Sequence, residues 1–404
     1  MDPQSLAQVI AQELHLQPAQ VARTVALLDE GNTIPFVARY RKEVTGSLDE
    51  DQLRDISARV EYLRKLEERK ETVLASIDSQ GKLTDELRNR IQAATVLQEV
   101  EDLYLPYKPR RRTRAMIARE RGLEPLAEMI LAQEVTQGTP ALIAANYVSE
   151  DVPTAEDALA GARDIVAEVV AEDADIRGFV RQYMLENATM AAKLAKNAAD
   201  PKGTYRLYYE YAERLAAIPP HRMLALNRGE REKVLDVSVE VDDEQVIQAV
   251  QHRYTRNARS IFYPELLAAV ADGYERLLRP SIEREVRAQH TEVAESHAIR
   301  VFGANLRALL LQPPLSDVRV LGIDPGYRTG CKAAAVDETG KYLDSVTIYP
   351  HQPQNRWEEA KQTLREIIKR TGAQVIAIGN GTASRETEKL AAELIGEGVP
   401  GANG

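Results

Sequence analysis

The chain has 404 residues, enough for roughly two to four domains with sizeable cores. Its 52 Lys and Arg residues are outnumbered by 62 Asp and Glu residues, which excludes a basic coat over the whole molecule. A single cysteine, Cys331, excludes an internal disulfide framework and a cysteine-based zinc site. The first residues do not resemble a signal peptide and no run of about eighteen apolar residues occurs, so we expect a cytoplasmic protein without membrane contact.

Up to about Leu311 the apolar residues recur mainly at helical spacing, which predicts a mainly helical N-terminal region. Residues 47–50 match a capping box that would begin a long helix, and residues 281–311 predict another helix of roughly thirty residues. One stretch interrupts this helical pattern. Apolar and polar residues alternate strictly over residues 235–241, which predicts a half-buried strand, and residues 223–226 are a candidate hairpin partner.

Beyond Pro313 and Pro314 the pattern becomes that of an α/β domain. Three strands are predicted at residues 318–323, 331–336 and 342–349, followed by a helix, a fourth strand at residues 375–378 and a helix from Ser384. A ribonuclease-H-like sheet normally has five strands. We therefore expect an incomplete α/β domain, in a chain that is a fragment with a polar tail after about Ile395.

Asp324 ends the first of these strands and is followed by a Pro-Gly turn, where a ribonuclease-H-like fold places its first metal-binding acid. Metal-assisted phosphoryl chemistry needs several converging carboxylates. The residue after the fourth strand is Asn380, which is neutral, and Glu386 lies further along in the next helix. We interpret Asp324, Asn380 and Glu386 as a vestigial site and expect no catalytic residue, bound metal or cofactor. A magnesium-dependent nuclease that uses Asp324 remains the alternative.

The densest basic run consists of Lys108, Arg110, Arg111, Arg112 and Arg114. Within residues 104–122, seven basic residues meet a single acid, Glu120. In an acidic chain this pattern predicts contact with phosphates, with Tyr104 and Tyr107 available to stack on bases. The alternative is an intramolecular clamp in which these side chains pair with acidic helices, for instance around residues 99–102.

Four stretches carry a resemblance to a known family. They are residues 32–43 (Asn-Thr-Ile-Pro-Phe-Val-Ala-Arg-Tyr-Arg-Lys-Glu), residues 103–109 (Leu-Tyr-Leu-Pro-Tyr-Lys-Pro), residues 322–326 (Gly-Ile-Asp-Pro-Gly) and residues 379–386 (Gly-Asn-Gly-Thr-Ala-Ser-Arg-Glu). With these stretches in this order, the chain resembles the Tex family of bacterial transcription accessory proteins from residue 1 to about residue 395.

The resemblance implies three regions. They are a Tex-type helical region at residues 1–200, a helical segment like a helix-turn-helix module with a small β-hairpin and a long connecting helix at residues 201–312, and a truncated YqgF-like, ribonuclease-H-like domain at residues 317–404. In the family, helix-hairpin-helix modules and an OB-fold RNA-binding module follow, and these would lie beyond Gly404.

The resemblance also implies a role. We expect a non-enzymatic scaffold of a nucleic-acid-binding transcription accessory protein, with RNA or DNA as a sequence-nonspecific partner and the transcription or translation machinery as a further partner. A second alternative is a protein-interaction scaffold with no nucleic-acid contact of its own.

Overall fold

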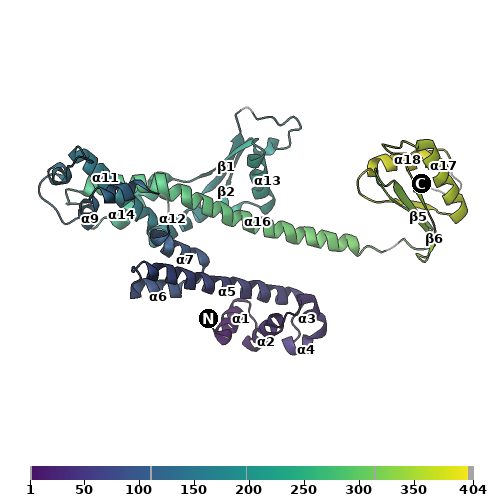
Figure 1. Ribbon diagram of the computed structural model, residues 1–404, viewed down its shortest axis with the longest axis horizontal. Coiled ribbons are helices and arrows are strands. Elements are labelled where there is room, and N and C mark those ends of the chain that lie inside the picture. The colour runs from purple at the N-terminus through teal and green to yellow at the C-terminus, as the bar shows by residue number, and fades with distance from the viewer. Residues whose placement is uncertain (1, 110–111, 197, 314, 399–404) are drawn as a thin grey trace. The chain divides into compact units, whose positions relative to one another are not determined.

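The chain folds into two compact units, Met1–Arg300 and Val301–Gly404, which are described separately here. A computed structural model describes residues 2–109, 112–196, 198–313 and 315–398 (Figure 1). The boundary between the units falls inside one continuous helix. In the described part of the chain, no helix is long and apolar enough to cross a membrane.

Seven helices open the first unit around a core of their own. They are α1 (Pro3–Glu13), α2 (Pro18–Asp29), α3 (Ile34–Tyr40), α4 (Lys42–Thr45), α5 (Glu50–Ser79), α6 (Asp85–Ala93) and α7 (Leu97–Tyr104). The long helix α5 contacts α1, α2, α3, α6 and α7, and it buries a stripe of residues three and four apart, such as Leu53, Ile56 and Val60. The helical period predicted for this region is confirmed.

The start of α5 corrects one expectation. The capping box is formed by Asp49 and Gln52, two residues beyond the predicted one. The Gln52 backbone N–H donates to Asp49 Oδ1 at 2.8 Å, and the Asp49 backbone N–H donates to Gln52 Oε1 at 3.0 Å. Ser47 cannot be the cap because its φ of 65° is left-handed, whereas an N-cap residue is extended.

The rest of the first unit is helical around a small sheet and a second, larger core. Its elements are η1 (Leu105–Tyr107), α8 (Arg114–Glu120), α9 (Glu124–Ala132), α10 (Pro140–Ala144), η2 (Ala145–Tyr147), α11 (Ala155–Glu172), α12 (Ala174–Asn187), β1 (Thr189–Leu194), η3 (Arg206–Tyr208), β2 (Glu210–Arg214), η4 (Leu215–Ala217), α13 (Pro220–Arg231), β3 (Leu235–Glu240), α14 (Asp243–Tyr254), α15 (Tyr263–Asp272), the π-helical η5 (Gly273–Leu278) and α16 (Arg279–Leu310). The sheet is antiparallel in the order β2-β1-β3.

The predicted strand at residues 235–241 is confirmed as β3, but its predicted hairpin partner is wrong. Residues 223–226 lie in the helix α13, where Pro220 occupies the first turn and Met223 and Leu226 are buried. The partner of β3 is β1, which follows directly after α12.

The helices α15, η5 and α16 follow one another without a break, and α16 appears as the long green helix in Figure 1. The predicted helix at residues 281–311 is therefore confirmed. The π-helical segment begins at Gly273, where an added Cβ would lie 2.7 Å from the Ala167 carbonyl oxygen of α11. Only glycine permits this close approach of the two helices.

The second unit is an α/β domain with a core of its own. Its elements are β4 (Val320–Asp324), β5 (Cys331–Val336), β6 (Tyr342–Ile348), α17 (Trp357–Thr371), β7 (Val375–Ile378) and α18 (Ser384–Gly396), as the four predicted strands and two helices require. The sheet order is β6-β5-β4-β7, and only β4 and β7 are parallel.

In this unit, Leu321 and Ile323 of β4 are buried together with Leu364 of α17 and Leu390 of α18. Figure 1 shows both helices on one side of the strands. The helix α18 extends to Gly396, and residues 399–404 of the tail expected after about Ile395 lie outside the described part of the chain.

Candidate nucleic-acid interface

The basic segment joins the 3-10 turn η1 to the helix α8. Of its predicted contact residues, Lys108, Arg112 and Arg114 are exposed, while Arg110 and Arg111 lie outside the described residues. Thr113 caps α8, because its Oγ1 accepts the Met116 backbone N–H at 3.1 Å. The cap fixes where the helix begins, so Arg114 occupies the first turn.

The exposed cations differ in their partners. Arg112 forms an ion pair with Glu120, and both side chains are more than half exposed. Lys108 and Arg114 make no ion pair with any described residue. Arg114 does lie close enough to Asp164 to oppose, with Arg276, the rise that burial causes in the pKa of that carboxyl group. An exposed pair such as Arg112–Glu120 contributes less than about 1 kcal/mol, so a phosphate can replace the carboxylate at little cost.

Of the two tyrosines that the sequence offered for stacking, Tyr104 does not fit that role. Tyr104 is buried, its hydroxyl lies 2.9 Å from Ser76 Oγ, and Arg69 sits over its ring at 5.4 Å. It is a core residue, so stacking on a base by Tyr104 is excluded. Tyr107 is half-buried and packs against the same core. Arg119, which continues the basic run, is paired with Glu168 at 2.7 Å and Glu124 at 3.2 Å.

The proposed clamp onto residues 99–102 is not found in the described residues. Glu101 pairs with Arg69 at 2.5 Å, and Glu99 accepts the Thr95 backbone N–H at 2.9 Å. Asp102 points instead toward α12. Its carboxylate accepts from Arg177 Nε at 2.8 Å and from Arg181 Nη2 at 2.7 Å.

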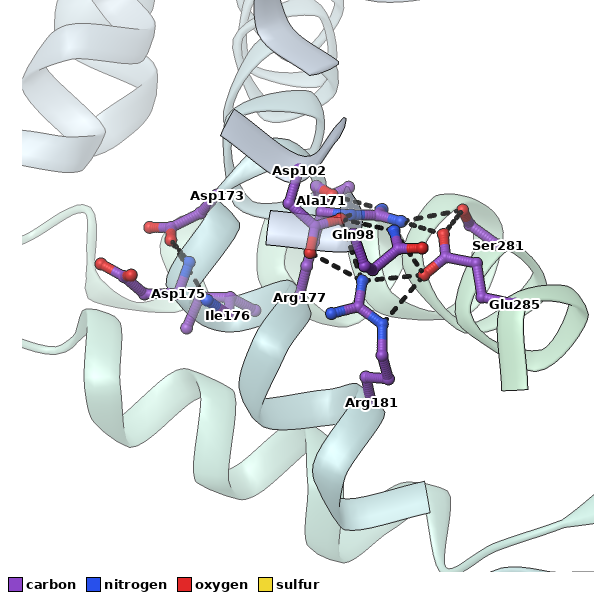
Figure 2. Close-up of polar contacts among 10 residues, drawn as sticks. All are labelled: Gln98, Asp102, Ala171, Asp173, Asp175, Ile176, Arg177, Arg181, Ser281 and Glu285. Carbon is purple, nitrogen blue, oxygen red and sulfur yellow. Dashed lines mark hydrogen bonds and ion pairs between the residues drawn. The ribbon is translucent and has the colours of Figure 1, made fainter. Parts of the chain in front are cut away.

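Asp102 belongs to a buried network at the junction of three helices (Figure 2). Arg177 and Arg181 of α12 each contact two carboxylates, those of Asp102 on α7 and Glu285 on α16. Ser281 joins through hydrogen bonds to Arg177 and Glu285. Arg177 and Asp102 are each only 4% exposed. Two positive and two negative charges balance, which makes their burial tolerable. The network holds α7, and with it the start of the basic segment, against α12 and α16.

A cleft of about 1000 Å³ opens beside the basic segment. Lys108, Pro109 and Arg119 line it, together with residues of α6, α7 and the α11–α12 turn. Its acidic lining residues are Asp102, Glu124, Glu168, Glu172, Asp173 and Asp175, and its basic ones are Lys82, Arg90, Lys108 and Arg119. Among the described residues that line the cleft, acids therefore outnumber bases.

The second predicted site lies at the carboxyl edge of the α/β sheet. Ile323 pairs with Ile378 across the parallel strands, which places Asp324 beside Gly379, the residue before Asn380. An added Cβ on Gly379 would lie 3.7 Å from Asp324 Oδ1. Glu386 is a neighbour of Tyr327 instead, since its carboxylate and burial together raise the pKa of the Tyr327 hydroxyl. Within the described residues, no group of three or more His, Cys, Asp or Glu side chains could hold a metal ion.

Three family models match the chain in order. They describe a Tex-like protein N-terminal domain at residues 4–78, a Tex central region at residues 136–302 and a Tex protein YqgF-like domain at residues 318–402. The chain belongs to the Tex family. The resemblance inferred from the four sequence stretches is thus confirmed, and so is the fold class, a mainly helical region followed by an α/β domain.

Several curated Tex relatives are similar along almost the whole chain. The transcriptional accessory protein Tex of Neisseria gonorrhoeae is 42% identical over 407 residues, which cover 98% of this chain and 52% of that protein. Protein YhgF of Escherichia coli strain K12 is 42% identical over 96% of this chain and 51% of its own length. Human S1 RNA-binding domain-containing protein 1 is 32% identical over 96% of this chain and 40% of its own length. The chain spans about half the length of the bacterial relatives it matches.

Sequence reasoning missed the buried network. One signal was present, because Arg177 and Arg181 lie four residues apart on a helix whose neighbouring positions Ile176, Val180 and Met184 are buried. Arginines beside an apolar stripe indicate a buried or interface role. Their carboxylate partners lie 75 or more positions away, and no local pattern connects them.

Proposed function

We propose that this chain is a non-enzymatic, nucleic-acid-binding part of a transcription accessory protein, and that it contacts the sugar-phosphate backbone through residues 108–114. The observation that carries the proposal is the exposure of Lys108, Arg112 and Arg114 on one short segment whose ends are fixed by η1 and by the Thr113 cap. None of the three is held by a buried carboxylate among the described residues.

This arrangement favours binding without sequence preference. Phosphate contacts position a protein on nucleic acid but carry no base information. Of the nearest aromatic side chains, Tyr104 is buried in the helical core and cannot read a base, and Tyr107 packs partly against the same core. Family membership also supports nucleic-acid binding linked to transcription. One relative is named a transcriptional accessory protein, and another is named for an S1 RNA-binding domain.

The test compares two triple variants of the full chain in binding to a fluorescently labelled 20-nucleotide RNA strand. One replaces Lys108, Arg112 and Arg114 with alanine. The matched control replaces Lys65, Arg88 and Arg231, which are also exposed and also lack ion pairs among the described residues. We expect the first to weaken binding by on the order of tenfold and the control to leave it unchanged. Equal affinities for the two variants would reject the segment as the contact surface.

A second candidate function is protein interaction, and one observation favours it. The C-terminal half of α16 exposes Ile299, Phe302, Leu306 and Leu309 at helical spacing. Apolar side chains in this pattern suit the surface of another protein and make no contact with phosphate. An RNA-binding experiment in which neither triple variant differs from the parent chain would favour this candidate.

We propose that the carboxyl edge of the sheet does not cleave nucleic acid. Asp324 lies beside Gly379, which the neutral Asn380 follows, and a pair of magnesium ions needs more carboxylates than this. Linear and branched RNA and DNA incubated with the chain in magnesium or manganese should stay intact, as with the Asp324→Asn variant. Cleavage that disappears in the Asp324→Asn variant would instead establish the nuclease alternative.

A further inference from the structure

The α/β unit contains a cavity of about 640 Å³ that shares only Glu386 with the predicted vestigial site. It lies between the turn after β4, the loop after β6 and the helix α18. Tyr327, His351, Asn355, Trp357, Glu386 and Lys389 line it, whereas Asp324 and Asn380 do not. Its size is in the range of small-molecule sites, which hold ligands in clefts of about 300–1,000 Å³.

Three aromatic rings form one wall of this cavity. The ring centroids of Tyr327 and His351 are 5.7 Å apart, and those of His351 and Trp357 are 6.3 Å apart, both at edge-on angles. An edge-on contact occupies at most one face of each ring, so both Tyr327 and Trp357 keep a face that His351 does not cover. Such rings bind a flat heteroaromatic ligand by stacking.

Buried His351 supplies a defined hydrogen-bond acceptor. We assign the Thr387 hydroxyl as donor to the Ala383 carbonyl oxygen at 2.8 Å, and with this assignment it accepts from His351 Nε2–H, also at 2.8 Å. This tautomer leaves Nδ1 as an acceptor, and Nδ1 has no hydrogen-bond partner among the described residues.

The position of Nδ1 follows from burial. His351 is only 6% exposed, yet no described side-chain nitrogen or oxygen is both sealed from solvent and without a partner. Nδ1 therefore keeps access to solvent, and His351 lines the cavity. Burial also lowers the pKa of His351, although the Glu386 carboxylate acts in the opposite direction, and the neutral, accepting form dominates near pH 7.

Two charged side chains complete the lining. Glu386 presents carboxylate oxygens beside Tyr327, and Lys389 lies one turn further along α18. The cavity thus combines a stacking wall, two neighbouring kinds of acceptor and one cation. The acceptors favour a ligand whose aromatic ring carries hydrogen-bond donors on its edge. The cation favours a phosphate elsewhere on the same ligand.

We propose that this cavity binds an unpaired guanine nucleotide. The base stacks on Tyr327 or Trp357, Glu386 and His351 Nδ1 accept from its donors, and Lys389 contacts its phosphate. Guanine is favoured because N1–H and the 2-amino group place two donors side by side, whereas the corresponding edge of adenine carries only one donor group. This site lies in a different unit from residues 108–114 and binds a base. The proposal is therefore independent of the phosphate contacts proposed above.

Trp357 is the single tryptophan of the chain, which makes its fluorescence a direct probe. The full chain is titrated with GMP, AMP, CMP and UMP, and with the RNA pentamers UUGUU and UUAUU. We expect saturable quenching by GMP with a dissociation constant at least about tenfold lower than that for AMP. A response to UUGUU as well identifies a strand as the ligand, and a response to GMP alone identifies a free nucleotide.

Variants separate specific binding from nonspecific quenching. Glu386→Gln should weaken GMP binding by on the order of tenfold. Glu388→Gln is the matched control, since Glu388 is equally exposed on the same helix and does not line the cavity. Lys389→Ala should weaken GMP binding severalfold and leave guanosine binding unchanged. Absence of saturable quenching, equal affinity for all four nucleotides, or equal effects of Glu386→Gln and Glu388→Gln would overturn the proposal.

Discussion

Arginine has two different roles in this chain, and burial decides between them. Arg177 is 4% exposed and is held by Asp102 and Glu285, so its charge is neutralised inside the protein. Arg112 is 65% exposed, and its ion-pair partner among the described residues is the exposed Glu120. The first charge stabilises the junction of three helices and is closed to ligands. The second is weakly held and open to a phosphate.

A prediction at this scale concerns His351, the one histidine in the α/β unit. Burial holds the pKa of His351 in the folded state below its ordinary value of 6.5. When pH falls below about 6.5, the unfolded chain takes up a proton before the folded one does, so the free energy of unfolding decreases. This stabilisation is complete above that pH and is lost as pH falls through the lowered pKa.

The measurement is urea unfolding of the α/β unit, followed by Trp357 fluorescence at several pH values for the parent chain and for His351→Gln. The stability difference between the two should be larger at pH 7.5 than at pH 5.5. A difference that stays constant over this range would show that His351 does not titrate on unfolding.

At the scale of elements, α7 contributes one carboxylate, that of Asp102, to its junction with α12 and α16. Replacing it with asparagine leaves Arg177 and Arg181 with Glu285 as their remaining carboxylate partner, which creates an excess of buried positive charge. We expect Asp102→Asn to reduce the free energy of unfolding of the first unit by about 3–5 kcal/mol.

Asp175→Asn is the matched control, because Asp175 also pairs with an arginine, Arg90 at 2.6 Å, but is 76% exposed. Asp175→Asn should lower the free energy of unfolding by less than about 1 kcal/mol. Urea unfolding followed by circular dichroism measures both. Similar costs for the two variants would contradict the structural role assigned to the buried network.

The elements that the sequence predicts well are those that local patterns define. The stripe on α5, the length of α16 and the strands of the α/β unit all follow from apolar spacing and from breaks at proline and glycine. At Gly330 a left-handed φ of 78° and an added Cβ only 2.7 Å from Tyr349 explain why a glycine ends the turn before β5.

Elements that depend on distant partners were not predicted. The strand β1, Thr189–Leu194, contains two alanines, a methionine and a leucine, and residues of this kind favour a helix. Pairing with β2 and β3 overrides that preference. The hairpin partner was therefore sought in residues 223–226, whose own pattern is compatible with helix or strand. The α/β cavity was missed for a similar reason, because Tyr327, His351 and Trp357 come together only through the fold.

At the scale of the whole molecule, the two units have separate cores, and that of Val301–Gly404 is the smaller. A smaller core stabilises a domain less. We expect the α/β unit to unfold at lower denaturant concentration than the helical unit. Trp357 fluorescence reports the former, and circular dichroism at 222 nm reports mainly the latter. A single transition with the same midpoint for both probes would contradict this separation.

The central claim is that Lys108, Arg112 and Arg114 contact phosphates, and the salt dependence of RNA binding tests it most directly. Each phosphate contact on a single strand contributes roughly 0.7 to the slope of log affinity against log salt concentration. The alanine variant of these three residues should therefore show a slope shallower by roughly 2, while the Lys65, Arg88 and Arg231 control keeps the slope of the parent chain. An unchanged slope in the first variant would contradict the account.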